Sequence, residues 1–212
     1  MVIAIDGPAG AGKSTVARAL AARLGFTYLD SGAMYRSVAL AALRAAADLD
    51  DGAALGAIAQ SARIDLDGER VSLDGEDVTA PIRAPEVTAA ASRVSVHPEV
   101  RAAMVERQRS LIGAGGWVAE GRDIGTVVAP DSPLKVFLTA SGEERARRRA
   151  AESGEHVVEV LGAIAERDSR DTERDHGALR VADDAIEVST DGLDVDAVVA
   201  WLAGLAADRG LA

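Results

Sequence analysis

A glycine-rich stretch near the start of the chain carries the clearest chemical signal, Gly7-Pro8-Ala9-Gly10-Ala11-Gly12-Lys13-Ser14. It satisfies G-x-x-x-x-G-K-[ST], the pattern of a phosphate-binding loop. Glycines let the backbone wrap so that its N–H groups point at phosphate oxygens, and a helix that starts near Lys13 adds its positive end. In such a loop Lys13 reaches the β- and γ-phosphates of a nucleoside triphosphate, and Ser14 binds the accompanying Mg²⁺. The candidate ATP-binding residues are Gly7, Pro8, Ala9, Gly10, Ala11, Gly12, Lys13, Ser14 and Thr15.

This loop alone does not separate kinases from GTPases and motors. The additional Gly10 gives the form G-x-x-G-x-G-K-S, which is similar to small-molecule and nucleotide kinases. The chain contains no N-K-x-D, the guanine-reading motif of GTPases. The sequence therefore favours a kinase over a GTP-dependent switch.

A second candidate site follows the next predicted strand, in Asp30-Ser31-Gly32-Ala33-Met34-Tyr35-Arg36. Ligands of parallel sheets bind beyond the carboxyl ends of strands, so these side chains could contact a ligand. The hydroxyl of Ser31, the ring of Tyr35 and the guanidinium of Arg36 could hold a sugar, a base and a phosphate. The alternative is a structural one, in which Ser31 caps a helix and Arg36 is exposed.

A third candidate is Glu120-Gly121-Arg122-Asp123, at the end of another predicted strand. Arg122 can bind a phosphate bidentately, and Asp123 can accept a hydrogen bond from the exocyclic amine that distinguishes cytosine from uracil. Glu120 could hold the water ligands of Mg²⁺. A surface ion pair in a turn is the competing interpretation.

The fourth candidate is the charged run from residue 166 to residue 174. Arg167, Asp171 and Arg174 are spaced i, i+4 and i+7, so on a helix they share one face that could clamp a transferred phosphoryl group. A solvated helix with surface salt bridges is the ordinary interpretation of such a run. The same interpretation, a charged surface, is preferred for the Arg-rich residues 145–149.

The elements that must position these residues alternate as in a parallel α/β domain. Short apolar runs predict strands at residues 2–5, 26–29, 117–119, 134–138 and 185–188. Helical spacing predicts helices at 14–24, 33–47, 86–96, 98–112 and 195–205, and two charged helices between 141 and 175. Residues 48–84 interrupt this alternation, with a β-hairpin predicted over 64–73.

Composition excludes several classes of protein. The 212 residues carry a formal net charge of −11, so general binding of nucleic acid or of anionic membranes is not expected. The absence of cysteine excludes disulfides and thiolate sites, and no apolar run reaches the roughly 18 residues of a membrane span. Without a basic leader the expected compartment is the cytoplasm. Of the 23 basic residues only Lys13 and Lys135 are lysines, and Lys135 is expected at the edge of a strand.

Together these motifs resemble the bacterial cytidylate kinase (CMP kinase) family of P-loop nucleoside monophosphate kinases. The loop, the Asp30–Arg36 run, Ala90-Ala91-Ser92, Val100-Arg101, Gly121-Arg122-Asp123 and the 166–174 run appear in that family's order, over nearly the whole chain. The family fold implies a five-stranded parallel sheet with helices on both faces, an inserted CMP-binding part with a small β element, and a short helical lid. In a single domain over 1–212, the core corresponds to about 1–31 and 113–212, the insertion to about 32–112 and the lid to about 145–175.

The resemblance also implies roles for individual residues. Ser92, Arg101 and Asp123 would read cytosine. Ser31 and Asp171 would hold the ribose, and Arg36 and Arg122 the monophosphate. The catalytic cations would be Lys13, Arg122, Arg167 and Arg174, and Arg174 would also approach the base. Glu120 stands where the family is expected to have Asp, which places its Mg²⁺-water role in question.

The implied reaction transfers the γ-phosphoryl group of MgATP to CMP or dCMP, by a monomer that binds neither nucleic acid nor membrane. The runner-up enzymes are a uridylate/cytidylate kinase and a shikimate kinase, and the non-enzymatic alternative is an ATP-binding regulatory module. The acidity does not oppose an anionic substrate, because residues 48–80 (net −7) and 183–212 (net −6) carry all of the excess and are expected away from the site.

Overall fold

The computed structural model describes residues 1–211, with the side chains of residues 152 and 153 outside the description. The chain divides into two compact units. The first contains Met1–Tyr28 and Ile112–Ala212, and the second contains Leu29–Leu111.

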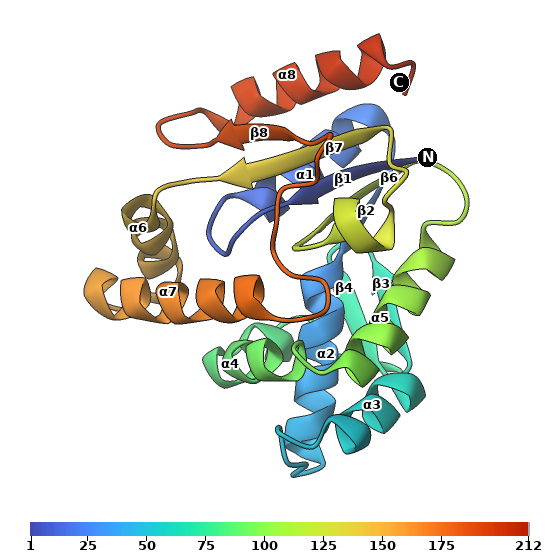
Figure 1. The fold of residues 1–212 in the computed structure, drawn as a ribbon, viewed down its shortest axis with the longest axis vertical. Coiled ribbons are helices and arrows are strands. Elements are labelled where there is room, and N and C mark those ends of the chain that lie inside the picture. The colour runs from blue at the N-terminus through green and yellow to red at the C-terminus, as the bar shows by residue number, and fades with distance from the viewer. Residues whose placement is uncertain (212) are drawn as a thin grey trace. The chain divides into compact units, whose positions relative to one another are not determined.

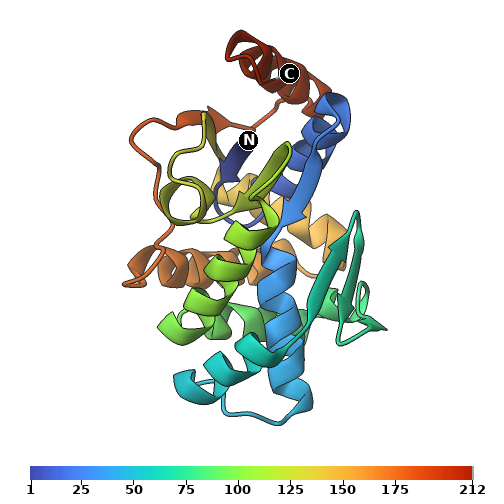
Figure 2. The same cartoon turned by 90° about the vertical axis from the view of Figure 1, so that its right-hand side faces the viewer.

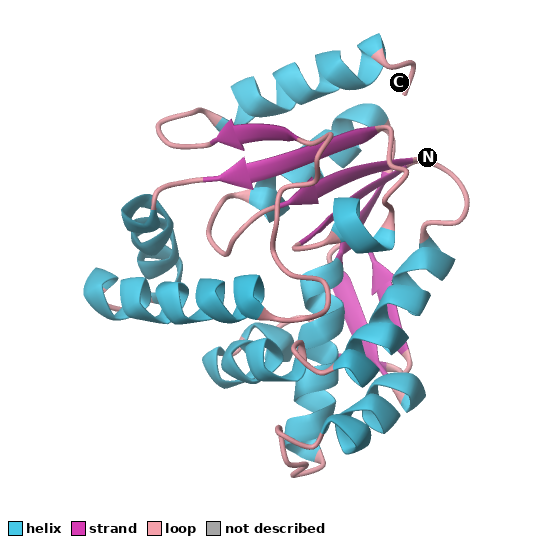
Figure 3. Cartoon of the chain, in the orientation of Figure 1, coloured by secondary structure: helices cyan, strands magenta, loops and turns pink. Residues whose placement is uncertain are grey.

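A five-stranded sheet organises the first unit (Figures 1 and 3). Its strands lie in the order β2 (Thr27–Asp30), β6 (Trp117–Gly121), β1 (Val2–Asp6), β7 (Leu134–Thr139) and β8 (Ile186–Ser189). β1 pairs in parallel with β6 and β7, and β7 pairs in parallel with β8. The parallel α/β architecture expected from the alternation is therefore confirmed.

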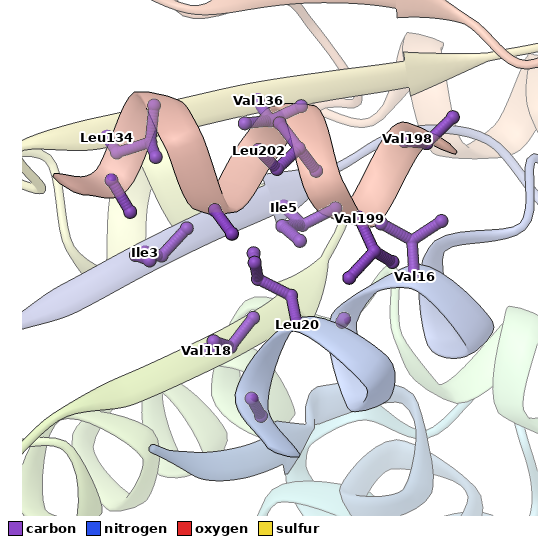
Figure 4. Close-up of a cluster of buried hydrophobic side chains, with 14 of the residues drawn as sticks. Ile3, Ile5, Val16, Leu20, Val118, Leu134, Val136, Val198, Val199 and Leu202 are labelled. Atoms are coloured by element: carbon purple, nitrogen blue, oxygen red, sulfur yellow. The ribbon is translucent and has the colours of Figure 1, made fainter. Parts of the chain in front are cut away.

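The core of this unit forms where one face of the sheet meets two helices, α1 (Lys13–Leu24) and α8 (Val195–Asp208). Side chains alternate between the faces of a strand, so Ile3 and Ile5 of β1 share a face with Leu134 and Val136 of β7. Figure 4 shows these side chains and those of the two helices pointing toward one another. The labelled members of this cluster are Ile3, Ile5, Val16, Leu20, Val118, Leu134, Val136, Val198, Val199 and Leu202.

The opposite face of the sheet carries η2 (Ile124–Val128), a short π-helix that the sequence pattern did not predict. Lys135 points to this face, because it alternates with Leu134 and Val136 along β7. Its Nζ donates a hydrogen bond of 2.8 Å to Asp184 Oδ1, and the residue is 8% exposed. The expectation of a strand-edge lysine is wrong, because β7 lies between β1 and β8.

Two packed helices, α6 (Gly142–Ser153) and α7 (Val157–Glu173), complete this unit, as the charged sequence predicted. Ser141 caps α6 by accepting a hydrogen bond from Glu144 N, and the acidic first turn favours the positive helix end. A small apolar cluster joins the pair: Ala146, Ala150, Val160 and Ile164.

The second unit combines four α-helices with a small antiparallel sheet (Figure 2). The helices are α2 (Ser31–Arg44), α3 (Gly52–Ser61), α4 (Pro85–Val94) and α5 (Pro98–Leu111), with a short 3₁₀ turn, η1 (Pro81–Arg83), before α4. The sheet has the strands β3 (Ile64–Asp67), β4 (Arg70–Leu73) and β5 (Glu76–Asp77). The predicted hairpin is confirmed, since β3 and β4 pair antiparallel on either side of Gly68.

Helix α3 is the main element that the sequence analysis missed, because residues 48–84 were expected to be irregular apart from the hairpin. Asp51 caps this helix by accepting from Ala54 N, and Leu55 and Ala59 are buried. A Cβ atom at Gly56 would lie 2.5 Å from Glu99 Cβ, so a glycine there allows α3 to pack closely on α5. The helix is specified by its cap and by this close packing rather than by strong amphipathic spacing.

Within residues 1–211, the structure offers no helix with both the length and the apolar character that crossing a bilayer requires.

Truncating Leu202 should destabilise the first unit, because this α8 side chain is fully buried against β1, β7 and α1. Leu202→Ala is expected to lower the free energy of unfolding by about 2–5 kcal/mol. Urea unfolding followed by circular dichroism measures it. Trp201→Ala, at the exposed neighbouring position, is the matched control and should cost much less. Equal losses in the two variants would contradict the assignment of this core.

Candidate active site

The glycine-rich loop connects β1 to α1, the strand-loop-helix context that a phosphate-binding loop requires. Gly7, Gly10 and Gly12 have φ angles of 148°, 78° and 83°, which side chains rarely allow. A Cβ atom at Gly7 would also collide with the backbone oxygen of Leu138 at the end of β7. The glycines are therefore needed both for the turn and for its approach to the sheet.

Lys13 is buried within this loop, and its side chain donates a hydrogen bond to a backbone carbonyl rather than to a carboxylate of the described residues. It is 6% exposed, and its Nζ donates a 2.8 Å hydrogen bond to Pro8 O. Burial, followed by the charge of Arg122, lowers the pKa of Lys13 well below that of an ordinary lysine, and Glu120 opposes this effect. A bound phosphate would supply the negative charge that favours the ammonium form.

A cavity of about 360 Å³ opens beside the loop, in the first unit. Ser14 and Thr15 in its wall are exposed. Its lining comes from the loop, α1, α6, α8 and the segment after β8: Gly10, Gly12, Lys13, Ser14, Thr15, Val16, Arg148, Arg149, Thr190, Leu193, Val195 and Val198.

The acidic segment 183–212 lines part of this cavity, and it does so through uncharged side chains. Thr190, Leu193 and Val195 all belong to residues 183–212. Among the acids of this segment, Asp191 accepts two 3.0 Å hydrogen bonds from Ser141 N. The negative charge of Asp191 is thus used to hold the start of α6.

The Arg-rich start of α6 is not simply a charged surface. Arg145 is 12% exposed, and its Nη1 donates to Ala9 O at 3.1 Å and to Asp168 Oδ2 at 2.6 Å. Arg148 donates to both Oγ1 and O of Thr190, and Thr190 Oγ1 in turn donates to Ala11 O. Of the four arginines in residues 145–149, only Arg147 fits the surface interpretation, with a side chain that is 69% exposed. Sequence spacing could not find these contacts, because they join segments far apart in the chain.

The Gly121-Arg122-Asp123 turn is held by the strand that leads into the glycine loop. Gly121 is the last residue of β6 and faces Asp6 in the parallel register. Asp6 also accepts hydrogen bonds from Ile124 N and Gly125 N, at 2.8 and 2.7 Å. The sequence analysis did not select Asp6, although it directly precedes the loop.

Three arginines surround one buried carboxylate, Asp171. The side chain of Asp171 is 6% exposed, and its oxygens lie 2.8 Å from Arg122 Nε, 4.0 Å from Arg167 Nε and 3.5 Å from Arg174 Nη1. Burial would raise the pKa of Asp171, but the three guanidinium groups lower it overall. Burial would likewise lower the pKa of Arg122, and Asp171 raises it overall. The cluster has more positive than negative charge and is suited to an anion.

The predicted shared helix face is correct for Arg167 and Asp171 but not for Arg174. α7 ends at Glu173, and Arg174 has extended backbone angles, with φ −66° and ψ 140°. Its Nε bonds Gly177 O at 2.5 Å while its Nη1 reaches back toward Asp171. Arg174 therefore joins the cluster from the segment that follows the helix.

Glu120 is buried, and its charge acts on Lys13. Tyr28 Oη donates a 2.6 Å hydrogen bond to Glu120 Oε1, and the Arg18 guanidinium lies 5.5 Å from the centre of the Tyr28 ring. A role for Glu120 in holding Mg²⁺ waters stays a prediction. Among residues 1–211 no group of three His, Cys, Asp or Glu side chains could hold a metal ion by itself.

The remaining predicted residues lie in the second unit. Asp30, rather than Ser31, caps α2 by accepting from Ala33 N, and Arg36 is ion-paired with Asp30 at 2.9 Å. The alternative of a Ser31 cap with a freely exposed Arg36 is therefore wrong. Ser31 is buried in the first turn of the helix.

Ser92 and Arg101 are both buried in the second unit, at α4 and α5. Arg101 Nη1 donates to Ser95 O at 3.4 Å, and its guanidinium lies 5.7 Å from the centre of the Tyr35 ring. Ser95 Oγ donates to Ser92 O, so Ser92 and Arg101 are linked through Ser95. The sequence analysis selected the ring of Tyr35 as a possible contact to a base, but it did not select Ser95.

The buried Asp6 should give the protein a distinctive pH dependence of stability. Burial raises the pKa of Asp6 to about 6, although the N–H groups of Gly125 and Ile124 lower it. The folded protein then binds a proton that the unfolded chain releases near pH 4, so stability falls as the pH rises from 4 to 6. Relative to Asp6→Asn, the wild type should lose about 3 kcal/mol over this interval.

Urea unfolding of both proteins at several pH values measures the difference. Carboxylates common to both, including Asp171 with its lowered pKa, act in the opposite direction and cancel in the comparison. Parallel stability curves for the two proteins between pH 4 and pH 6 would contradict the raised pKa.

Comparison with known proteins shows similarity over nearly the whole chain. The family model described as cytidylate kinase matches residues 3–207. The chain is 52% identical over 207 residues to the cytidylate kinase of Pelotomaculum thermopropionicum, covering 93% of this chain and 92% of that one. It is 48% identical over 219 residues to the bifunctional pantoate ligase/cytidylate kinase of Synechococcus sp. (strain CC9902). That match covers 98% of this chain but only 45% of the bifunctional protein, so the chain spans less than half of such relatives.

Among solved structures, an uncharacterized protein from Eubacterium ventriosum ATCC 27560 has a TM-score of 0.53 at 14% identity, with 97% of both chains covered. This likeness concerns the fold alone. The family-model match, by contrast, concerns the sequence. Residues 3–207 include the glycine loop, the Gly121-Arg122-Asp123 turn and the Asp171 cluster. The chain belongs to the cytidylate kinase family.

Proposed function

We propose that the protein transfers the γ-phosphoryl group of MgATP to CMP, and also to dCMP, giving CDP or dCDP and ADP. The observation that carries this proposal is the group of three arginines around Asp171, in the same unit as the buried Lys13 of the glycine loop. A module that only binds ATP would need the loop and not this additional cationic cluster. Phosphoryl transfer needs both, because charge develops on the transferred group and on both flanking oxygens.

The reaction requires positioning and charge stabilisation more than it requires a base. The 5′-phosphate of CMP, with a second pKa of about 6, is largely ionised at neutral pH. One of its oxygens attacks the γ-phosphorus, the bond to the β,γ-bridging oxygen breaks, and ADP leaves with that electron pair. Lys13, Arg122, Arg167 and Arg174 would stabilise the charge, and loss of such an arginine typically costs several orders of magnitude in rate.

Mg²⁺ would arrive with the triphosphate rather than sit in a preformed protein site. The exposed Ser14 hydroxyl at the start of α1 suits this, since Mg²⁺ usually takes few protein ligands and completes its shell with phosphates and waters. When bound, the ion neutralises part of the charge on the β- and γ-phosphates. Ser14 would hold it, and Glu120 would orient its waters.

For the acceptor nucleotide we assign the residues that the family resemblance selects. Ser92, Arg101 and Asp123 are proposed to read cytosine. Ser31 and Asp171 are proposed to hold the ribose, and Arg36 and Arg122 the monophosphate. Arg36 pairs with Asp30, and Arg122 pairs with Asp171. About 32–112 would form the CMP-binding insertion and about 145–175 the lid, in a monomer whose partners are nucleotides.

A coupled assay over CMP, dCMP, UMP, AMP, GMP and shikimate tests the assignment, with CMP expected to give the highest kcat/KM and dCMP to follow it. The kcat/KM for CMP should exceed that for UMP by more than about tenfold. Uracil lacks the exocyclic amine of cytosine and would therefore leave buried hydrogen-bond acceptors unpaired. Turnover of UMP or AMP that equals or exceeds that of CMP would refute the cytosine assignment. Tight ATP binding without turnover of any acceptor would favour the regulatory module instead.

Removal of the Asp123 carboxylate should weaken base discrimination more than ATP binding. Asp123→Ala is expected to lower the CMP/UMP ratio of kcat/KM by about 5- to 150-fold, which corresponds to roughly one to three kcal/mol of base readout. The Kd for ATP should change by less than about threefold, since the glycine loop is unaltered. Asp183→Ala, at an exposed acid in the same unit, is the matched control. An unchanged CMP/UMP ratio in Asp123→Ala would remove the reading role.

A further inference from the structure

We propose that Asp6 is a positioning residue that sets the Arg122-Asp123 turn for phosphoryl transfer, a role that rests on the proposed function. Asp6 is the last residue of β1 and directly precedes Gly7 of the glycine loop. It is 5% exposed, and within the described structure its carboxylate binds backbone rather than a cationic side chain.

The turn is attached to Asp6 at both of its ends. On one side, the backbone of Asp6 faces Gly121, the residue before Arg122, in the β1–β6 register. On the other side, the Asp6 carboxylate binds Ile124 N through Oδ1 and Gly125 N through Oδ2, at 2.8 and 2.7 Å. Arg122 and Asp123 are the only two residues between these attachments, so a shift of the Asp6 carboxylate must move them.

The two N–H groups that Asp6 binds are donors that the π-helix cannot satisfy itself. The first hydrogen bonds of η2 run from Val127 N and Val128 N to Asp123 O, which leaves Ile124 N and Gly125 N without a helical acceptor. A buried N–H group that is left unpaired destabilises the fold. The carboxylate at position 6 therefore specifies where η2 begins.

Gly125 shows how closely the two elements approach. A Cβ atom there would lie 3.2 Å from Lys135 Cδ, which is tighter than ordinary packing, and 3.4 Å from Asp6 Oδ2. A side chain at position 125 would therefore require either the Lys135 side chain or η2 to shift. The second attachment of the turn thus depends on the acid at position 6 and leaves little room for a side chain at position 125.

The consequences of this attachment reach both sides of the reaction. Arg122 continues from the turn to Asp171, 2.8 Å away, and so to Arg167 and Arg174. Asp123 is the proposed reader of cytosine. Asp6 also directly precedes the glycine loop. The same residue therefore fixes the position of the turn relative to the loop, which are the proposed sites of the acceptor nucleotide and of the donor phosphates.

The test compares Asp6→Asn with Ser132→Ala. Asparagine keeps the shape of the side chain but replaces one acceptor oxygen with a donor, so one N–H of η2 loses its partner. Ser132 is the matched control, because its Oγ is also buried and donates to Val2 O at the opposite end of β1. Both variants lose a buried hydrogen bond, and only one of them touches the turn.

We expect Asp6→Asn to lower kcat/KM for CMP by about 10- to 100-fold at saturating MgATP, since small misplacements of reacting groups cost this much. The CMP/UMP preference should fall several-fold, while the Kd for ATP changes by less than about threefold. Ser132→Ala should leave all three within about threefold of wild type. Equal kinetic losses in the two variants, or a CMP/UMP ratio that Asp6→Asn does not change, would overturn the proposal.

Two further measurements keep the test independent of folding yield and of the proposed function. If Asp6→Asn fails to fold, Gly125→Ala should produce the same selective kinetic loss, and wild-type kinetics in that variant would refute the proposal. Amide hydrogen exchange should become faster at residues 122–126 in Asp6→Asn but not in Ser132→Ala. Unchanged exchange there would refute the positioning role even in a protein that does not phosphorylate CMP, whereas inactivity of the wild type toward CMP refutes the proposed function alone.

Discussion

The first unit must hold three arginine side chains close together, and much of its arrangement depends on this constraint. Arg122, Arg167 and Arg174 repel one another, and they stay together because Asp171 supplies the opposing charge in a place where water is largely excluded. The same three arginines lower the pKa of Asp171, because their positive charges favour its ionised form. Strand β6, helix α7 and the segment after it must each end at the right place for these four side chains to meet.

The same constraint accounts for the treatment of the two other buried charges near the loop. Lys13 is held by a backbone carbonyl, and the N–H groups of η2 hold Asp6. Neither is hydrogen-bonded to an oppositely charged side chain in the described residues. Backbone dipoles can orient a charge without neutralising it, so Lys13 keeps its capacity to attract phosphate.

Local chemistry made much of this arrangement predictable. Glycines that need positive φ revealed the loop, apolar runs revealed the strands, and Gly68 between alternating residues revealed the hairpin. Residues such as Arg122 and Asp171 could be selected because their types and spacing match phosphate chemistry. The roles assigned to them toward CMP remain predictions.

What could not be predicted depends on contacts between distant segments. The sequence indicates a surface position for Arg145, but its guanidinium contacts Ala9 and Asp168. The sequence likewise indicates a strand edge for Lys135, but β8 pairs with the strand that carries it. Helix α3 depends on the closeness of Glu99 to Gly56, and η2 on a carboxylate 118 residues away. In each of these cases the determining partner is remote in sequence, which a spacing pattern cannot detect.

The burial of both lysines has a practical consequence for chemical work on the protein. Lys13 and Lys135 are the only lysines of the chain, and they are 6% and 8% exposed. Acylating reagents and amine-directed fluorophores should therefore react slowly with both lysine side chains.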